Sequence, residues 1–133
     1  MGRAGQAAAG CLIRCQDGDR RAMELIELSD SVQQIVLEGR LDTVAVGALE
    51  TRFTAIVSGG SKDVLVDLTN AAFCGSLAIR MFLSNARVLQ RRGRRLVLAG
   101  AQPQVQEVFE TVALGAIIPI FASVQDGRAE LGA

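Results

Sequence analysis

Residues 63–80 read DVLVDLTNAAFCGSLAIR, and a strand, a loop and the start of a helix are predicted within this stretch. Residues 63–68 form a compact apolar run with β-branched valines, which is typical of a strand buried at the centre of a sheet. Residues 69–74 are expected to form a loop, and Ser76 then stands at the beginning of a helix. A buried strand that leads into a helix is the repeating unit of an α/β fold, so strands and helices should alternate on both sides of it.

Two strands and one helix are predicted before this stretch. Residues 22–28 (AMELIEL) and 32–39 (VQQIVLEG) are joined by the polar residues SDS, which predicts an antiparallel hairpin. A helix follows, with Asp42 or Thr43 as its cap and the SGGS stretch as its end. The apolar positions at helical spacing in this segment are Ala45, Leu49, Phe53, Ile56 and Val57.

A second helix and a further strand are predicted directly after the quoted stretch. Gly93 is placed to end the helix that begins near Ser76, because glycine readily adopts the left-handed conformation of a C-cap. Residues 94–100 (RRLVLAG) predict the next strand. The apolar face of the helix comprises Ile79, Phe82, Leu83, Ala86 and Leu89.

The last part of the chain predicts a third helix, an edge strand and a short final helix. Pro103 suits the first position of the third helix, whose apolar stripe is formed by Val105, Val108, Phe109 and Val112. Residues 116–123 (AIIPIFAS) predict a strand that lies at an edge or begins near Pro119, because proline cannot donate to a ladder. Residues 123–131 are expected to form the final helix.

This alternation predicts an α/β fold with a mixed, mostly parallel sheet of about five strands and four helices packed against it. Residues 22–133 are expected to form this single domain, and residues 1–21 a flexible tail of polar and small residues. Neither an internal repeat nor a linker indicates a second domain.

Composition excludes several classes of function. The 133 residues include 14 basic and 14 acidic side chains, so there is no net charge to favour non-specific binding to nucleic acid or to a membrane surface. No apolar run approaches the roughly 20 residues that span a bilayer, and the N-terminal segment is too poor in large apolar residues for a secretory signal. We therefore expect a cytoplasmic protein in which Cys11, Cys15 and Cys74 are free thiols.

The sequence contains no histidine, which excludes several kinds of catalytic and metal site. A Ser–His triad, a Cys–His pair or an imidazole metal site cannot form within the chain, and Cys11 and Cys15 lack the further ligands of a zinc site. Asp42 and Asp67 have local uses, as a helix cap and in an Asx-type turn, rather than as paired catalytic carboxylates. The sequence predicts no enzyme activity, no cofactor and no metal site.

The basic stretch RRGRR at residues 91–95 is interpreted as a solvated helix end, because cations are favoured near the C-terminus of a helix. A contact with an acidic partner is the alternative. No aromatic side chains are interleaved to stack bases, so direct binding of nucleic acid is not expected.

Over residues 23–131 the sequence resembles the STAS domains (sulfate transporter and anti-sigma-factor antagonist), in their small stand-alone bacterial form. Residues 38–42 (EGRLD) match the Gly-x-Leu-Asp of that family, and residues 64–73 (VLVDLTNAAF) match its central strand. Residues 87–100 and 108–131 are similar to its next helix and strand and to its closing elements. The resemblance implies a STAS-like fold and a non-catalytic protein-interaction module.

In this family the first hydroxyl residue after the central strand is phosphorylated by a partner kinase, and position by position this residue corresponds to Ser76. The resemblance implies an anti-sigma-factor antagonist that binds an anti-sigma factor with a serine-kinase fold and is switched off by phosphorylation. The sequence departs from the pattern where the family has an aspartate, a second hydroxyl residue and a glycine. These three positions are Gly75, Leu77 and Ala78.

Two questions stay open at this stage. The hydroxyl of Ser76 can serve as a helix cap alone or as a phosphoacceptor. The chain can also be a constitutive accessory subunit of a membrane lipid-transport ATPase, without membrane insertion of its own, and a homodimer is a further possibility. The residues expected to contact a partner are Thr69, Asn70, Gly75, Ser76, Leu77, Ala78 and Ile79.

Overall fold

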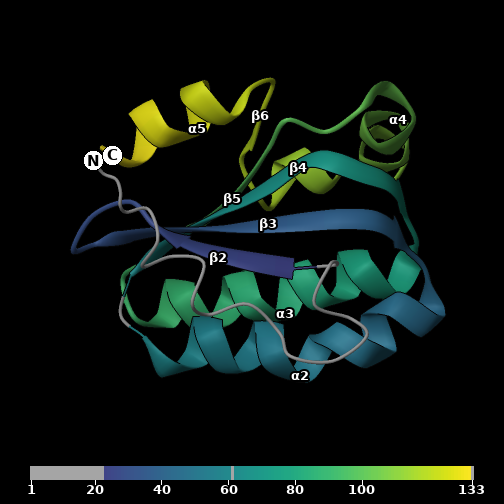
Figure 1. Cartoon of the computed structure of the whole chain (residues 1–133). Coiled ribbons are helices and arrows are strands. Elements are labelled where there is room, and N and C mark those ends of the chain that lie inside the picture. Colours follow the sequence, from purple (N-terminus) through teal and green to yellow (C-terminus); the bar gives the residue numbers. More distant parts are fainter. Residues whose placement is uncertain (1–22, 61, 133) are drawn as a thin grey trace.

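The computed structural model describes residues 23–60 and 62–132, and within them five strands form one sheet (Figure 1). β2 (Met23–Glu27) is antiparallel to β3 (Val32–Leu41). β4 (Asp63–Cys74), β5 (Leu96–Ala99) and β6 (Ile120–Phe121) then continue the sheet in parallel. The predicted mixed, mostly parallel sheet is thereby confirmed.

Four helices accompany the sheet, as predicted. They are α2 (Thr43–Gly59), α3 (Ser76–Arg91), α4 (Pro103–Thr111) and α5 (Val124–Leu131), with a short 3-10 turn η1 (Leu114–Ala116) before β6. No helix of the described ranges is long and apolar enough to cross a membrane. The tail predicted at residues 1–21, with Cys11 and Cys15, lies outside the described residues.

The sheet lies between two helical layers. α2 and α3 lie side by side on one face, and α5 lies on the other (Figure 1). Because alternate residues of a strand point to opposite faces, Val64 and Val66 join the core beneath α2 and α3, whereas Leu65 joins the smaller core beneath α5. The largest side chains of the first core include Phe53, Phe82 and Phe109.

Most of the predicted helix and strand boundaries are confirmed. The Asp42 carboxylate caps α2 by accepting a hydrogen bond from the backbone N–H of Ala45 at 3.0 Å. Gly93 follows α3 with φ +75°, the left-handed conformation expected of a helix end. Pro103 is the first residue of α4, and Pro119 directly precedes the edge strand β6.

The loop predicted at residues 69–74 is wrong, because β4 continues through it to Cys74. The extension pairs with the end of β3, where Gly39 opposes Ala71 and Leu41 opposes Cys74. Two register shifts interrupt this pairing, and Gly39 adopts φ +82° beside one of them, as glycines at bulges often do. Ala71 and Cys74 anchor the extension because both are buried in the core.

The third helix and the last strand are shorter than predicted. α4 ends at Thr111, so the side chain of Val112 lies beyond it and is 51% exposed instead of completing the apolar stripe. The predicted strand at residues 116–123 contains only the two residues of β6, because η1 occupies the segment before Ile117 and Pro119 has no N–H for a ladder.

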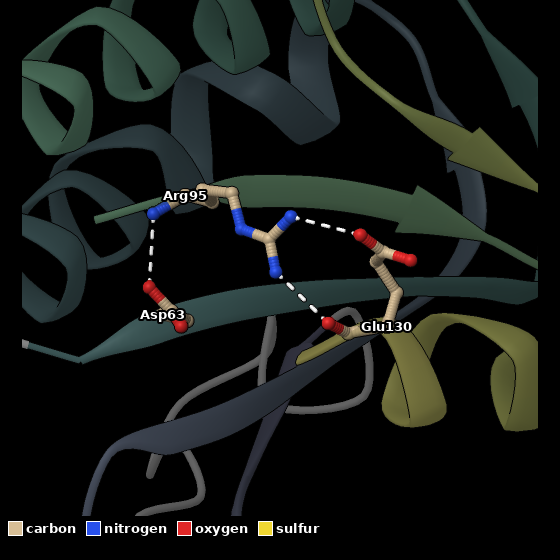
Figure 2. A network of polar contacts seen from close by, with 3 residues as sticks. All are labelled: Asp63, Arg95 and Glu130. Atoms are coloured by element: carbon tan, nitrogen blue, oxygen red, sulfur yellow. Dashed lines mark hydrogen bonds and ion pairs between the residues drawn. The ribbon is translucent and has the colours of Figure 1, made fainter. Parts of the chain in front are cut away.

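Two arginines of the basic stretch at residues 91–95 tie separate elements together. The Arg92 guanidinium donates to the backbone carbonyls of Ser58 and Gly60 at the end of α2. Arg95 donates to the side chain and the backbone carbonyl of Glu130 in α5, at 3.1 and 2.9 Å, and its own N–H donates to Asp63 at 3.0 Å (Figure 2). These partners lie more than 30 residues away and were not predicted.

Candidate functional site

The ends of two neighbouring parallel strands place two helix N-termini next to each other. β3 ends at Leu41 and β4 at Cys74, which oppose each other in the sheet, and α2 and α3 begin directly afterwards. The backbone N–H of Gly75 donates to the carbonyl of Leu41 at 3.1 Å. We call the residues around this junction, 42–44 and 75–77, the helix-start edge.

Ser76 is the first residue of α3, and its side chain is exposed. The N-cap position belongs to Gly75, whose carbonyl accepts the N–H groups of Ala78 and Ile79 at 3.1 and 3.2 Å. No side chain caps α3, so the structure contradicts the helix cap, one of the two roles left open for Ser76. A serine cap at position 76 would require the helix to begin at residue 77, but α3 begins at residue 76. Among the described residues, the hydroxyl of Ser76 therefore has no structural role.

The helix-start edge has an uneven distribution of charge. α2 is capped by the carboxylate of Asp42, whereas α3 has neither a side-chain cap nor an acidic residue in its first turn. The first N–H groups of a helix have no intrahelical partner, and they make this end of α3 locally positive. The exposed Arg80 stands one turn beyond Ser76, on the same side of the helix. An oxygen nucleophile at Ser76 is therefore accessible, and negative charge placed on it is electrostatically favoured.

The other residues predicted to contact a partner differ in accessibility. Gly75 and Leu77 lie at the helix-start edge with Ser76, and both are half-buried. Leu77 and Ile79 pack part of their side chains against the core, whereas Ala78 is fully buried and has no surface to offer. The inclusion of Ala78 is corrected accordingly.

Thr69 and Asn70 are exposed, but they lie within β4, several residues before its end at Cys74. They are therefore not part of the helix-start edge. The Thr69 carbonyl accepts a hydrogen bond from the side chain of Gln102 at 2.8 Å. This bond joins β4 to the segment before α4. The two residues therefore border the site at a distance along the strand.

Val44 belongs to the helix-start edge but was not predicted. It is in the first turn of α2 and is 81% exposed, which is unusual for a large apolar side chain in a folded domain. The apolar segment TVAVGAL contains valines on both faces of the helix, so composition alone does not separate Val44 from the buried Val46. The buried residues Val46, Leu49 and Phe53 define the inner face of α2, and Val44 does not lie on that face.

A chain of polar contacts centred on the buried Gln34 lies on the opposite face of the sheet, beneath α5. Asp67 accepts the N–H of Thr69 at 2.9 Å, which confirms the predicted Asx-type turn. Its other oxygen accepts from the Gln34 amide at 2.9 Å, and the Gln34 carbonyl oxygen accepts two hydrogen bonds from Arg128 at 3.1 and 2.7 Å. Gln34 thus separates a carboxylate from a guanidinium.

Cys74 is a free cysteine, as predicted, and its side chain is buried. Desolvation by burial raises the pKa of its thiol from 9.0 to about 12, which makes a reactive thiolate unfavourable. Within the described ranges, no cluster of three or more His, Cys, Asp or Glu side chains is placed to hold a metal ion.

Comparison with known proteins gives one family and one fold. The sequence profile of the STAS domain family matches residues 23–127. The anti-sigma-B factor antagonist of Staphylococcus aureus is 25% identical over 85 residues, which cover 64% of this chain and 79% of the relative. This agrees with the function predicted from the sequence.

Two solved structures share the fold. An anti-sigma factor antagonist from Mycobacterium paratuberculosis superposes with a TM-score of 0.75 and 19% identity, covering 90% of this chain and all 100% of that one. The unphosphorylated anti-sigma factor antagonist SpoIIAA superposes with a TM-score of 0.70 and 21% identity, over 84% of this chain and 98% of that one. SpoIIAA, a Bacillus cell fate determinant, has also been solved in a phosphorylated form.

Proposed function

Because the chain belongs to the STAS domain family, we propose that it is an anti-sigma factor antagonist that binds an anti-sigma factor and is switched off by phosphorylation of Ser76. The observation that carries this proposal is the exposed Ser76 hydroxyl at the first position of α3, free of any capping role. The partner expected for such an antagonist is an anti-sigma factor with a serine-kinase fold, because the proposed modification needs a kinase to transfer the phosphoryl group.

The chemistry of the switch is simple. The kinase transfers the γ-phosphoryl group of ATP to Oγ of Ser76, the hydroxyl loses its proton and ADP leaves. The phosphate adds about −1.5 to −2 charges at neutral pH. The unpaired N–H groups at the start of α3 and the Arg80 guanidinium one turn later favour this charge, so the fold tolerates the modification.

The partner is affected differently. A contact built on a neutral hydroxyl and on the neighbouring apolar side chains of Val44 and Leu77 loses complementarity when a solvated dianion is placed in its middle. We therefore expect the unmodified protein to bind and the phosphorylated protein to be released. Gly75, where the family has an aspartate, leaves no carboxylate to compete with the phosphate for the first N–H groups of α3, so the helix start can accommodate the modification.

The test is affinity capture from the native cytoplasm with wild type, Ser76→Ala and Ser76→Asp as parallel baits. We expect wild type and Ser76→Ala to retain an anti-sigma factor with a kinase fold, and Ser76→Asp to lose it. The purified partner should then transfer ³²P from ATP to wild type and not to Ser76→Ala. Circular dichroism is expected to show the same fold for all three baits, because the hydroxyl has no capping bond to lose.

Two results would contradict the proposal. Labelling of Ser76→Ala would move the modification to another residue. Retention of a transport ATPase by all three baits, with no anti-sigma factor, would assign the chain to the accessory-subunit class instead.

A further inference from the structure

The exposed side of α3 bears a row of arginines that begins beside Ser76. The exposed positions along this side are Ser76, Arg80, Ser84, Arg87 and Arg91. At 100° and 1.5 Å per residue, the three arginines lie within an arc of about 40° and extend over about 16 Å of the helix. We call Arg80, Arg87 and Arg91 the arginine row.

The charges of the arginine row are not balanced within the domain. α3 contains no acidic residue, and the structure shows no ion pair or hydrogen bond for these three guanidinium groups among the described residues. Arg92 and Arg95, only a few residues further on, have defined partners. The adjacent helix α2 has one exposed acid, Glu50, and one exposed base, Arg52, so it adds no compensating charge.

The three unpaired arginines concentrate positive charge on one side of α3, although the chain as a whole has 14 basic and 14 acidic residues. An acidic protein surface fits it better than nucleic acid does. The aromatic residue of α3, Phe82, is buried and cannot stack on bases, and the net charge of the chain is zero. The row also starts one turn from Ser76, where a kinase partner must reach.

We propose that the arginine row docks an acidic surface of the anti-sigma factor, and that phosphorylation of Ser76 acts through this row. The inference rests on the proposed function and specifies its partner and its regulation. A phosphate on Ser76 stands at the i, i+4 spacing from Arg80, at which side chains of a helix meet. It pairs with Arg80 and places up to about two negative charges at one end of a row of three positive ones, so the attraction for the partner falls.

The experiment measures association and dissociation rates with the anti-sigma factor retained by the wild-type bait, purified and immobilised on a sensor surface. The test variant is Arg87→Gln/Arg91→Gln, which removes two positive charges far from Ser76. The control is Gln125→Glu/Ala129→Glu, which changes the net charge by the same amount on exposed positions of α5, across the sheet. Neither pair includes a residue of the helix-start edge.

We expect the association rate of Arg87→Gln/Arg91→Gln to fall about tenfold at 0.05 M salt with a small change in dissociation rate, as is usual for charges that steer an encounter. The difference should shrink strongly at 0.5 M salt, where charges are screened within a few ångströms. The control variant should associate like wild type. Ser76→Asp should lower the association rate by a larger factor in the wild-type background than in the Arg80→Gln background. In the Arg80→Gln background, position 80 has no positive charge for the aspartate to cancel.

The outcomes separate the two proposals. If wild type binds the anti-sigma factor and the Arg87→Gln/Arg91→Gln variant associates at the same rate, the arginine row inference is overturned and the proposed function stands. If the control slows association as much as the test variant, net charge and not the row is responsible. Loss of duplex RNA or DNA binding by the test variant, with anti-sigma factor binding unchanged, would assign the row to nucleic acid. If wild type binds no anti-sigma factor, both proposals fail.

Discussion

The backbone N–H of Gly75 donates a hydrogen bond to the carbonyl of Leu41 over 3.1 Å, and it thereby joins the two points at which β3 gives way to α2 and β4 to α3. The helix-start edge is consequently a single unit built on the sheet. Side chains from both helices keep a fixed relation to each other, which a partner that contacts Val44 and Ser76 together requires.

Gly75 provides a direct test of how α3 is capped. A Cβ at this position would lie 3.3 Å from the ring of Phe73, so any side chain must displace the ring slightly. Gly75→Ala and Gly75→Asp share that cost, but only aspartate supplies an acceptor for the free N–H groups of the first turn. We expect the free energy of unfolding of Gly75→Asp to exceed that of Gly75→Ala by about 1 kcal/mol. Urea denaturation followed by circular dichroism measures this difference, and equal stabilities would show that the N-cap position is misassigned.

Val44 tests whether the helix-start edge is the binding surface. Val44→Glu places a charge in the proposed contact, and we expect the affinity for the anti-sigma factor to fall at least about tenfold, or 1.4 kcal/mol. Stability should change by less than about 0.5 kcal/mol, because the side chain is 81% exposed and an acid suits the first turn of a helix. Val112→Glu, at another exposed valine, is the control in isothermal calorimetry. Similar losses in both variants would argue against a localised surface.

Gln34 tests the polar chain beneath α5. Its side chain is 3% exposed and bonds both Asp67 and Arg128, so Gln34→Leu removes a hydrogen-bond partner from each of these two half-buried charged groups. We expect a loss of about 2 kcal/mol in the free energy of unfolding. The adjacent Gln33 is 5% exposed and has no side-chain hydrogen bond to the described residues, so Gln33→Leu should cost much less. A cost for Gln33→Leu as large as that for Gln34→Leu would refute this role of the network.

Cys74 gives the domain a pH-dependent stability. Burial raises the pKa of its thiol from 9.0 to about 12 in the folded state, so between these values the unfolded chain loses a proton that the folded one retains. The stabilisation is complete below pH 9.0 and is lost progressively as the pH rises toward 12. Between pH 7 and pH 10.5, wild type should lose about 2 kcal/mol more than Cys74→Ala in urea unfolding. Equal losses of unfolding free energy in wild type and Cys74→Ala would mean that the thiol is not desolvated.

The sequence predicts those features of the fold that depend on neighbouring residues. Helical spacing and turn residues locate all four helices, and Asp42 and Gly93 have the capping roles that their chemistry indicates. The extension of β4 through residues 69–74 was missed because it depends on pairing with the tail of β3, more than 30 residues earlier. Asn70, Ala71 and Ala72 are of residue types that are depleted in strands, so this segment has little strand signal of its own.

The place of Ser76 at a helix start was predicted, whereas the N-cap role of Gly75 was not. Ser76 stands at a helix start as expected, yet the identity of the cap depends on a difference of one residue that propensities do not resolve. The apolar face of α3 was predicted, but neither the arginine row on its exposed side nor Val44 was singled out from the sequence. The contact between Gln34 and Arg128 joins residues 94 positions apart, and no local pattern reports it.

The strands follow the same order in the sheet as in the chain, and this has a consequence for synthesis on the ribosome. Among the described strands, each one pairs with the strand that precedes it in the chain, so this sheet can grow one strand at a time without threading a later strand between earlier ones. The exception is the closing helix, whose Arg128 must return to β3, and we expect its docking to be the final event of folding.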